Sequence, residues 1–129
     1  MKKILLIAFT LVLSPVASAE VTNKFDVIYD NCLKAAGEIN NGSVAECSEK
    51  TSTAAKTEIN FLYRKIYEML SSKSPNDAAK FEQSQKAWLA YRNKHCELAT
   101  DYVGSPMYGF CPMKLNISRV SELQELLGQ

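Results

Sequence analysis

The chain has 129 residues, and its 15 basic and 14 acidic side chains give a formal net charge of +1. This length is enough for one domain and hardly for two. The near balance of charge gives no electrostatic basis for binding nucleic acid or an anionic membrane surface, so neither is expected as a partner.

The first residues have the pattern of a bacterial export signal. Two lysines precede an apolar run over residues 4–13, and Ala-Ser-Ala at residues 17–19 forms a small-residue cleavage site. The apolar run is too short for a permanent membrane anchor. We therefore expect a signal peptide over residues 1–19 and one mature domain over residues 20–129, which is periplasmic or secreted and not stably inserted in a membrane. Cleavage would leave 13 basic and 14 acidic side chains, a net charge of −1.

Apolar residues that recur every three or four positions predict four helices. We expect them over residues 22–38, 43–70, 75–103 and 116–127. The two long helices are joined by a short turn, which favours an antiparallel pair, and the two shorter helices then cover the remaining apolar faces. The sequence shows no convincing strand alternation. It therefore predicts an all-α fold, a compact helical bundle with two long antiparallel helices and two shorter ones.

Capping residues and helix breakers set the expected ends of these helices. Ser43 as N-cap, with Glu46 three residues later, fits a capping box. Ser74 as N-cap followed by Pro75 starts the third helix. Two glycines and a proline within residues 104–110 predict a loop before the last helix.

The four cysteines flank two of the expected connections. Cys32 and Cys47 lie on either side of an Asn-Asn-Gly turn, and Cys96 and Cys111 on either side of the later loop. Four cysteines allow three connectivities, and we favour Cys32–Cys47 with Cys96–Cys111 because each pair would join neighbouring helices across a turn. Closing such a loop is worth about 3 kcal/mol in chain-entropy terms. No C-x-x-C pair occurs and the spacings suit no common zinc template, so no metal is expected.

The third predicted helix carries an unusual stripe of side chains. Trp88, Arg92 and Cys96 are four residues apart and lie in line, with Tyr91 and His95 beside them. One interpretation is a core anchor, with Trp88 between the long helices and Arg92 paired to a carboxylate. The other is a binding surface, because Trp, Tyr and Arg dominate interface hot spots. We favour the core anchor.

The sequence offers no set of catalytic residues. His95 and Cys96 are adjacent, and adjacent residues on a helix point about 100° apart, so they do not form a nucleophile–base pair. A disulfide would also consume the thiol. No phosphate-binding loop, Ser-His-Asp set or metal cluster is present. Neither an enzyme nor a cofactor is expected.

A set of residues across the chain resembles the LprI-like lysozyme-inhibitor domain. The resemblance rests on Gln85-x-x-Trp88-x-x-Tyr91-Arg92-x-x-x-Cys96, Gly104-Ser105, Cys111, Ser118-Arg119-x-x-x-Leu123 and, earlier, Cys32, Cys47 and Leu62-Tyr63-x-x-Ile66-Tyr67. It implies an α-helical, disulfide-stapled periplasmic domain in which Trp88, Tyr91, Arg92 and Arg119 form a structural motif. The founding member of that family inhibits lysozyme. That member is a lipoprotein with a second domain, whereas the first cysteine here is Cys32, so we expect an unlipidated protein.

Two functional hypotheses follow from the resemblance and the export signal. The first is a periplasmic protein that binds and inhibits a lysozyme or another peptidoglycan hydrolase. The alternative is a non-inhibitory envelope adaptor or stress module that binds another exported protein. An exposed apolar patch along Phe61, Tyr63 and Tyr67 would favour the alternative.

An inhibitor usually inserts a side chain or a loop into the cleft of its enzyme. The expected loop with Ser105 and Tyr108 is the first candidate contact, and the helix face with Tyr91 and Lys94 is the second. Lysozyme is strongly basic, and a partner with a net charge of −1 offers it little long-range electrostatic steering.

Overall fold

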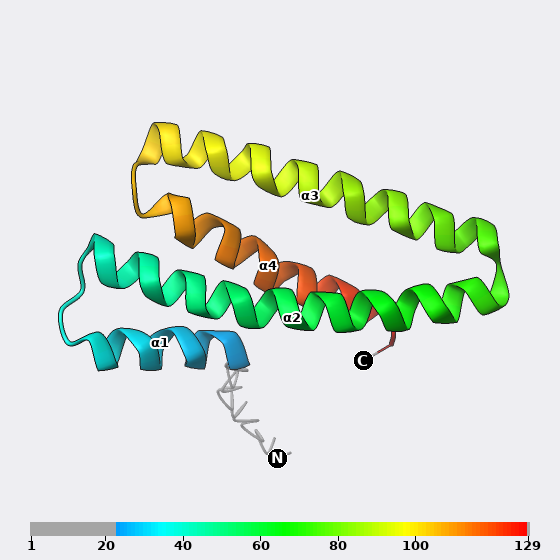
Figure 1. Ribbon diagram of the computed structural model, residues 1–129, viewed down its shortest axis with the longest axis horizontal. Coiled ribbons are helices and arrows are strands. Elements are labelled where there is room, and N and C mark those ends of the chain that lie inside the picture. Colours follow the sequence, from blue (N-terminus) through cyan, green and yellow to red (C-terminus); the bar gives the residue numbers. More distant parts are fainter. Residues whose placement is uncertain (1–22, 129) are drawn as a thin grey trace, which may run out of the picture.

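Four helices make up most of residues 23–128, the part of the chain that the computed structural model describes (Figure 1). They are α1 (Lys24–Ala36), α2 (Asn41–Lys73), α3 (Pro75–Val103) and α4 (Met107–Leu126). No strand occurs within the described residues. The all-α bundle with two long antiparallel helices is therefore confirmed, whereas the expected signal peptide over residues 1–19 lies outside the described part of the chain.

A single residue, Ser74, separates the two long helices. Its backbone N–H donates to the carbonyl of Leu70 at the end of α2, and its side-chain oxygen accepts from the backbone N–H of Asp77 at 3.3 Å. Pro75 occupies the first position of α3, where the missing N–H removes no helical hydrogen bond. The predicted start of α3 is confirmed, and the tight turn makes α2 and α3 antiparallel.

The start of α2 differs from the prediction. Asn40, not Ser43, is the N-cap, and its side-chain oxygen accepts from the backbone N–H groups of Gly42 and Ser43. Ser43 completes the capping box from the third helical position, because its hydroxyl oxygen accepts from the N–H of Asn40 at 2.9 Å. The box predicted with Glu46 was therefore placed three residues too late.

The last helix also begins earlier than predicted, at Met107 instead of residue 116. Only residues 104–106 connect α3 to α4, so most of the expected loop at 104–110 is helical. Gly109 lies where α4 approaches α2 closely, since an added Cβ there would come within 3.3 Å of the Cβ of Ser48. Pro112 lies inside α4 and removes one of its backbone hydrogen bonds. Tertiary packing therefore outweighs the local signals for a loop.

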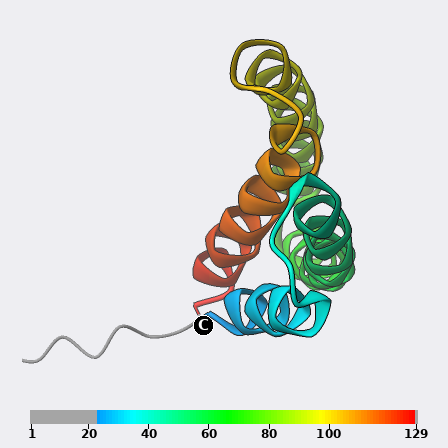
Figure 2. The same cartoon turned by 90° about the vertical axis from the view of Figure 1, so that its left-hand side faces the viewer.

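The core lies where α2 meets the other three helices. Figure 2 looks along the bundle from the end with the α1–α2 and α3–α4 connections, and shows α1, α2 and α4 around a common centre with α3 beyond them. Leu62, Ile66 and Leu123 are fully buried there, and burying a side chain of this size contributes about 1.5–3 kcal/mol. Within the described residues, no helix combines the length and apolar character needed to cross a membrane.

The N-terminal half of α2 buries small and polar side chains instead of large apolar ones. They are Ser43, Cys47, Ser48, Thr51 and Ser52. The hydroxyl oxygens of Ser48 and Thr51 have no hydrogen-bond partner within the described residues. Because these side chains are small, α4 can approach α2 closely at Gly109.

Both disulfides lie at the end of the bundle that Figure 2 faces. Cys32–Cys47 joins α1 to α2 and Cys96–Cys111 joins α3 to α4, each with a Cα–Cα distance of 5.5 Å. No cysteine is left free. The favoured connectivity is confirmed, and it anchors the two loops of this end to their helices.

Candidate partner-binding surface

Trp88 lies partly buried between α3 and α4, next to two arginines. The guanidinium carbon of Arg92 is 5.2 Å from the centre of the indole ring, and that of Arg119 is 5.4 Å away. Both distances are in the range of cation–π interactions. Arg119 itself is buried, and the indole also packs against the apolar core.

Arg92 is paired with amide groups and not with a carboxylate. Its Nη1 donates to Oδ1 of Asn116 on α4 at 2.9 Å, and its Nε and Nη2 donate to Oδ1 of the neighbouring Asn93. Asn116 in turn donates from Nδ2 to the hydroxyl oxygen of Ser52 on α2 at 2.8 Å. The expected carboxylate partner was therefore wrong, and a chain of hydrogen bonds with neutral acceptors instead joins α3 to α4 and α4 to α2. Burial lowers the pKa of Arg92 from its ordinary value.

Arg119 forms a second polar link between α3 and α4. Its Nε and Nη2 both donate to Oε1 of Gln85, at 3.1 and 3.0 Å, and its Nη1 pairs with Glu122 at 2.7 Å. Gln85, Trp88, Arg92 and Arg119 thus form one layer between these helices. All four belong to the motif quoted for the family resemblance. Arg119 is buried, and the other three are half-buried.

Tyr91 and Lys94 lie on the outer face of α3, as the sequence suggested. Tyr91 is 55% exposed and stacks on His95 with ring centres 5.4 Å apart. Lys94 forms an exposed ion pair with Glu97 at 2.9 Å. Exposed pairs of this kind contribute little to stability.

The other two candidate contacts lie at the end of the bundle that holds the disulfides. The hydroxyl oxygen of Ser105 accepts a hydrogen bond from Nδ2 of Asn41 at 3.1 Å, which ties the α3–α4 connection to the start of α2. Tyr108 belongs to the first turn of α4, not to a loop, and its side chain is 79% exposed. The structure thus brings Ser105 and Tyr108 to one end and leaves Tyr91 and Lys94 farther along α3.

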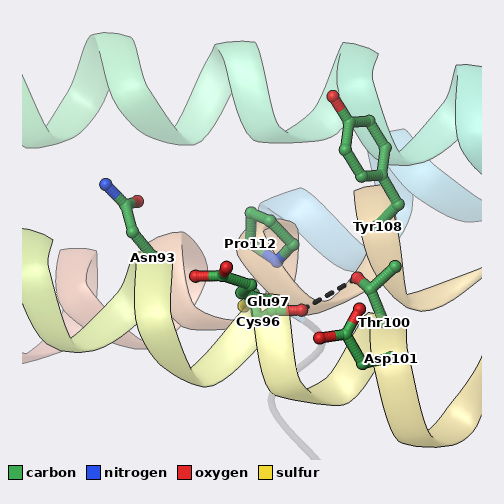
Figure 3. A pocket seen from close by; sticks show the side chains of 7 residues that line it. All are labelled: Asn93, Cys96, Glu97, Thr100, Asp101, Tyr108 and Pro112. Atoms are coloured by element: carbon green, nitrogen blue, oxygen red, sulfur yellow. Dashed lines mark hydrogen bonds between the residues drawn. The ribbon is translucent and has the colours of Figure 1, made fainter.

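Tyr108 also lines a groove of about 380 Å³ between α3 and α4. The groove is lined by Asn93, Cys96, Glu97, Thr100, Asp101, Tyr108 and Pro112 (Figure 3). The Thr100 hydroxyl donates to the carbonyl of Cys96 at 2.8 Å, so this donor is already used within α3. The groove therefore presents an aromatic side from α4 and two carboxylates from α3.

The carboxylates of this groove were not recognised from the sequence. Glu97 and Asp101 are four residues apart, which places both on one face of a helix, but that spacing also fits a solvated surface. Tyr108 lines the same groove from α4, and its position depends on the early start of that helix.

A second groove, of about 350 Å³, runs between α2 and α3 beside Trp88 and Arg92.

Within the described residues, no three metal-ligating side chains come together. The thiol of Cys96 is consumed by its disulfide, so His95 has no neighbouring nucleophile.

A family model described as "Lysozyme inhibitor LprI" matches residues 32–123, well over half of the chain. No curated protein and no solved structure matches the chain. The matched range includes both disulfides and the layer of Trp88, Arg92 and Arg119.

Proposed function

This chain belongs to the LprI lysozyme inhibitor family, and from that membership we propose that it binds and inhibits a lysozyme-type peptidoglycan hydrolase outside the cytoplasm. The single observation that carries the proposal is the family match over residues 32–123. The family is one of inhibitors and not of enzymes, so blocking another protein requires no chemistry from this chain.

The disulfides support the proposed compartment. Two structural disulfides persist in oxidising surroundings such as the periplasm or the exterior of the cell, and are rare in the cytosol. The export-signal pattern over residues 1–19 agrees with the same location. We therefore place the proposed inhibitor where it would meet hydrolases that attack peptidoglycan.

An inhibitor of this kind needs exposed side chains held on a rigid base. Tyr108 meets that need, because it is exposed on a helix that Cys111 ties to α3. A tyrosine supplies a large contact area with few rotatable bonds, so fixing it on binding costs little conformational entropy. Cys96–Cys111 also restricts the backbone of the connection between α3 and α4, just before Tyr108.

The adaptor hypothesis depended on a continuous apolar patch that the structure divides. Phe61 and Tyr63 are two residues apart on α2 and so point to different faces. The Tyr63 ring stacks on Phe81 and on Tyr67, with ring centres 5.2 and 6.0 Å apart, and Lys65 lies over Phe61. Phe61 and Tyr67 are still 46% and 39% exposed, so these contacts divide the aromatic surface without burying it.

The proposal is tested by clearing of cell-wall suspensions by lysozyme. The exported protein, with both disulfides intact, is titrated into a turbidity assay, and a reduced and alkylated sample serves as the matched control. The proposal predicts that the native protein slows clearing in proportion to its concentration and that the reduced sample does not. Unchanged clearing with each hydrolase tested, together with no binding by calorimetry, would contradict it.

A further inference from the structure

The apolar side chains with the greatest exposure lie mainly where α3 ends and α4 begins. Tyr102, Val103 and Tyr108 are 86%, 73% and 79% exposed, and Leu98 is 56% exposed. We define the end surface as these four side chains together with Glu97 and Asp101, the carboxylates of the neighbouring groove. So much exposed aromatic and aliphatic surface in one place is typical of an interaction site.

The end surface has a rigid base. Cys96 and Cys111 join the two helices that carry it, and the bond between Asn41 and Ser105 fixes the short connection between them to α2. The adjoining α1–α2 connection is held by Cys32–Cys47 (Figure 2). Little ordering remains to be done when a partner binds, which lowers the entropic cost of association.

Acidic side chains predominate around the end surface, and Lys94 is the basic side chain that pairs with one of them, Glu97. Residues 37–49 and 97–113, which form the two connections and the adjoining helix ends, contain five carboxylates and no basic residue. The rest of the described chain contains 13 basic and eight acidic side chains. Although the net charge is near zero, the charges are unevenly distributed along the bundle. The acidic end can therefore attract a basic partner, which the net charge alone would not do.

The carboxylates are also available to a partner. Asp101 forms no ion pair among the described residues, and Glu97 pairs only with Lys94, with both side chains exposed. A basic protein surface that approached this end would meet an attractive potential and then aromatic side chains.

We infer that the end surface is the contact site for a basic peptidoglycan hydrolase of the lysozyme type, with Tyr108 and Tyr102 as apolar contacts and Glu97 and Asp101 as the groups that attract it. This inference rests on the proposed function and adds to it the surface and the charge of the partner. It also separates the binding site from the layer of Trp88, Arg92 and Arg119 inside the bundle.

The test compares two pairs of charge reversals that change the net charge equally. The variant Glu97→Lys/Asp101→Lys alters the end surface. The control Glu82→Lys/Glu68→Lys lies away from the end surface. Each variant removes one carboxylate with an ion pair, Glu97 or Glu82, and one without an ion pair among the described residues. Association with a basic c-type lysozyme is measured at low and physiological salt. The end-surface variant should associate about tenfold more slowly at low salt and lose most of the salt dependence, and the control should not.

A second comparison tests the apolar contacts without changing charge. Tyr108→Ala should raise the dissociation rate about tenfold, whereas Phe61→Ala, an exposed aromatic on α2, should leave it unchanged. Thermal unfolding of all four variants shows that each is folded.

The outcomes are distinguishable. The inference is overturned if the end-surface variant and its control lose the same share of the association rate. It is also overturned if neither Tyr108→Ala nor the end-surface charge reversal weakens inhibition. In both cases the proposed function stands. Binding of cytochrome c, a basic protein that is not a hydrolase, as tight as that of lysozyme would reduce the end surface to a general cation binder and overturn the inference. Absence of any inhibition by the wild-type protein refutes the proposed function and this inference with it.

Discussion

Replacing Arg92 with alanine should destabilise the fold without touching the end surface. Asn116, which is 1% exposed, would lose the donor to its Oδ1, and a buried acceptor left unpaired costs about 1–3 kcal/mol. The cation–π contact with Trp88 would also be lost, at about 0.5–1 kcal/mol. The bonds to Asn93 are exposed and add little. We therefore expect a loss of about 2–4 kcal/mol, a large part of the ~5–15 kcal/mol typical of a small domain.

The assay is thermal and urea unfolding of the oxidised protein, followed by circular dichroism. A loss of this size lowers the midpoint by roughly 8–17 °C for a chain of this length. Arg64→Ala is the matched control, because Arg64 is an exposed arginine on α2, and its midpoint should stay near that of the wild type. Arg92→Lys should fall between the two, because lysine keeps the charge but not the planar fork of donors.

A double-mutant cycle with Asn116→Ala tests the proposed cause. If Arg92 acts through Asn116, the double variant loses less stability than the two single losses added together. An Arg92→Ala midpoint within about 3 °C of the wild type, together with weakened binding to lysozyme, would refute the assignment of Arg92 to the interior.

Three further changes test the packing of the bundle. Reduction of both disulfides should lower the melting midpoint by many degrees, since each closes a 15-residue separation worth about 3 kcal/mol; a reduced sample that melts with the oxidised one would contradict this. Thr51→Val should raise the free energy of unfolding by about 1 kcal/mol, because it removes a buried hydroxyl with no hydrogen-bond partner and keeps the side-chain shape. A lower free energy of unfolding in urea would show that the hydroxyl has a partner in solution. Gly109→Val should cost about 1–3 kcal/mol, because Ser48 already lies in the space that its side chain needs; Ala79→Val, at an exposed position on α3, is the control for adding a β-branched residue.

The sequence predicted the long helices well because their signals are local and consistent. Small and apolar residues recur at helical spacing along α2 and α3, and Ser74-Pro75 marks the boundary between them through capping alone. The disulfide pairing was predictable for a similar reason. Each pair of cysteines flanks one connection, so the expected turns already placed the partners near each other.

The N-terminal half of α4 could not be predicted in the same way. Pro106, Gly109 and Pro112 all disfavour a helix locally, and what outweighs them is distant in sequence: the contact with Ser48 and the disulfide to Cys96. One error led to the others. With α4 expected to begin at residue 116, neither the partner of Arg92 on α4 nor the placement of Tyr108 over the groove was predictable.

The family resemblance and the proposed binding site depend on different parts of the molecule. Gln85, Trp88, Arg92 and Arg119 hold α3 against α4 through contacts within the chain, so we expect relatives that have them to share this helix packing whatever their partner. The chemistry that would select a partner lies instead in side chains outside that layer, such as Asp101 and Tyr108 at the end surface. Substitutions there leave the core contacts intact. It follows that a family member with the same interior layer but a basic or polar end surface should keep the fold and fail to bind a basic hydrolase, and that exchanging residues 97–108 between two such proteins should transfer the binding.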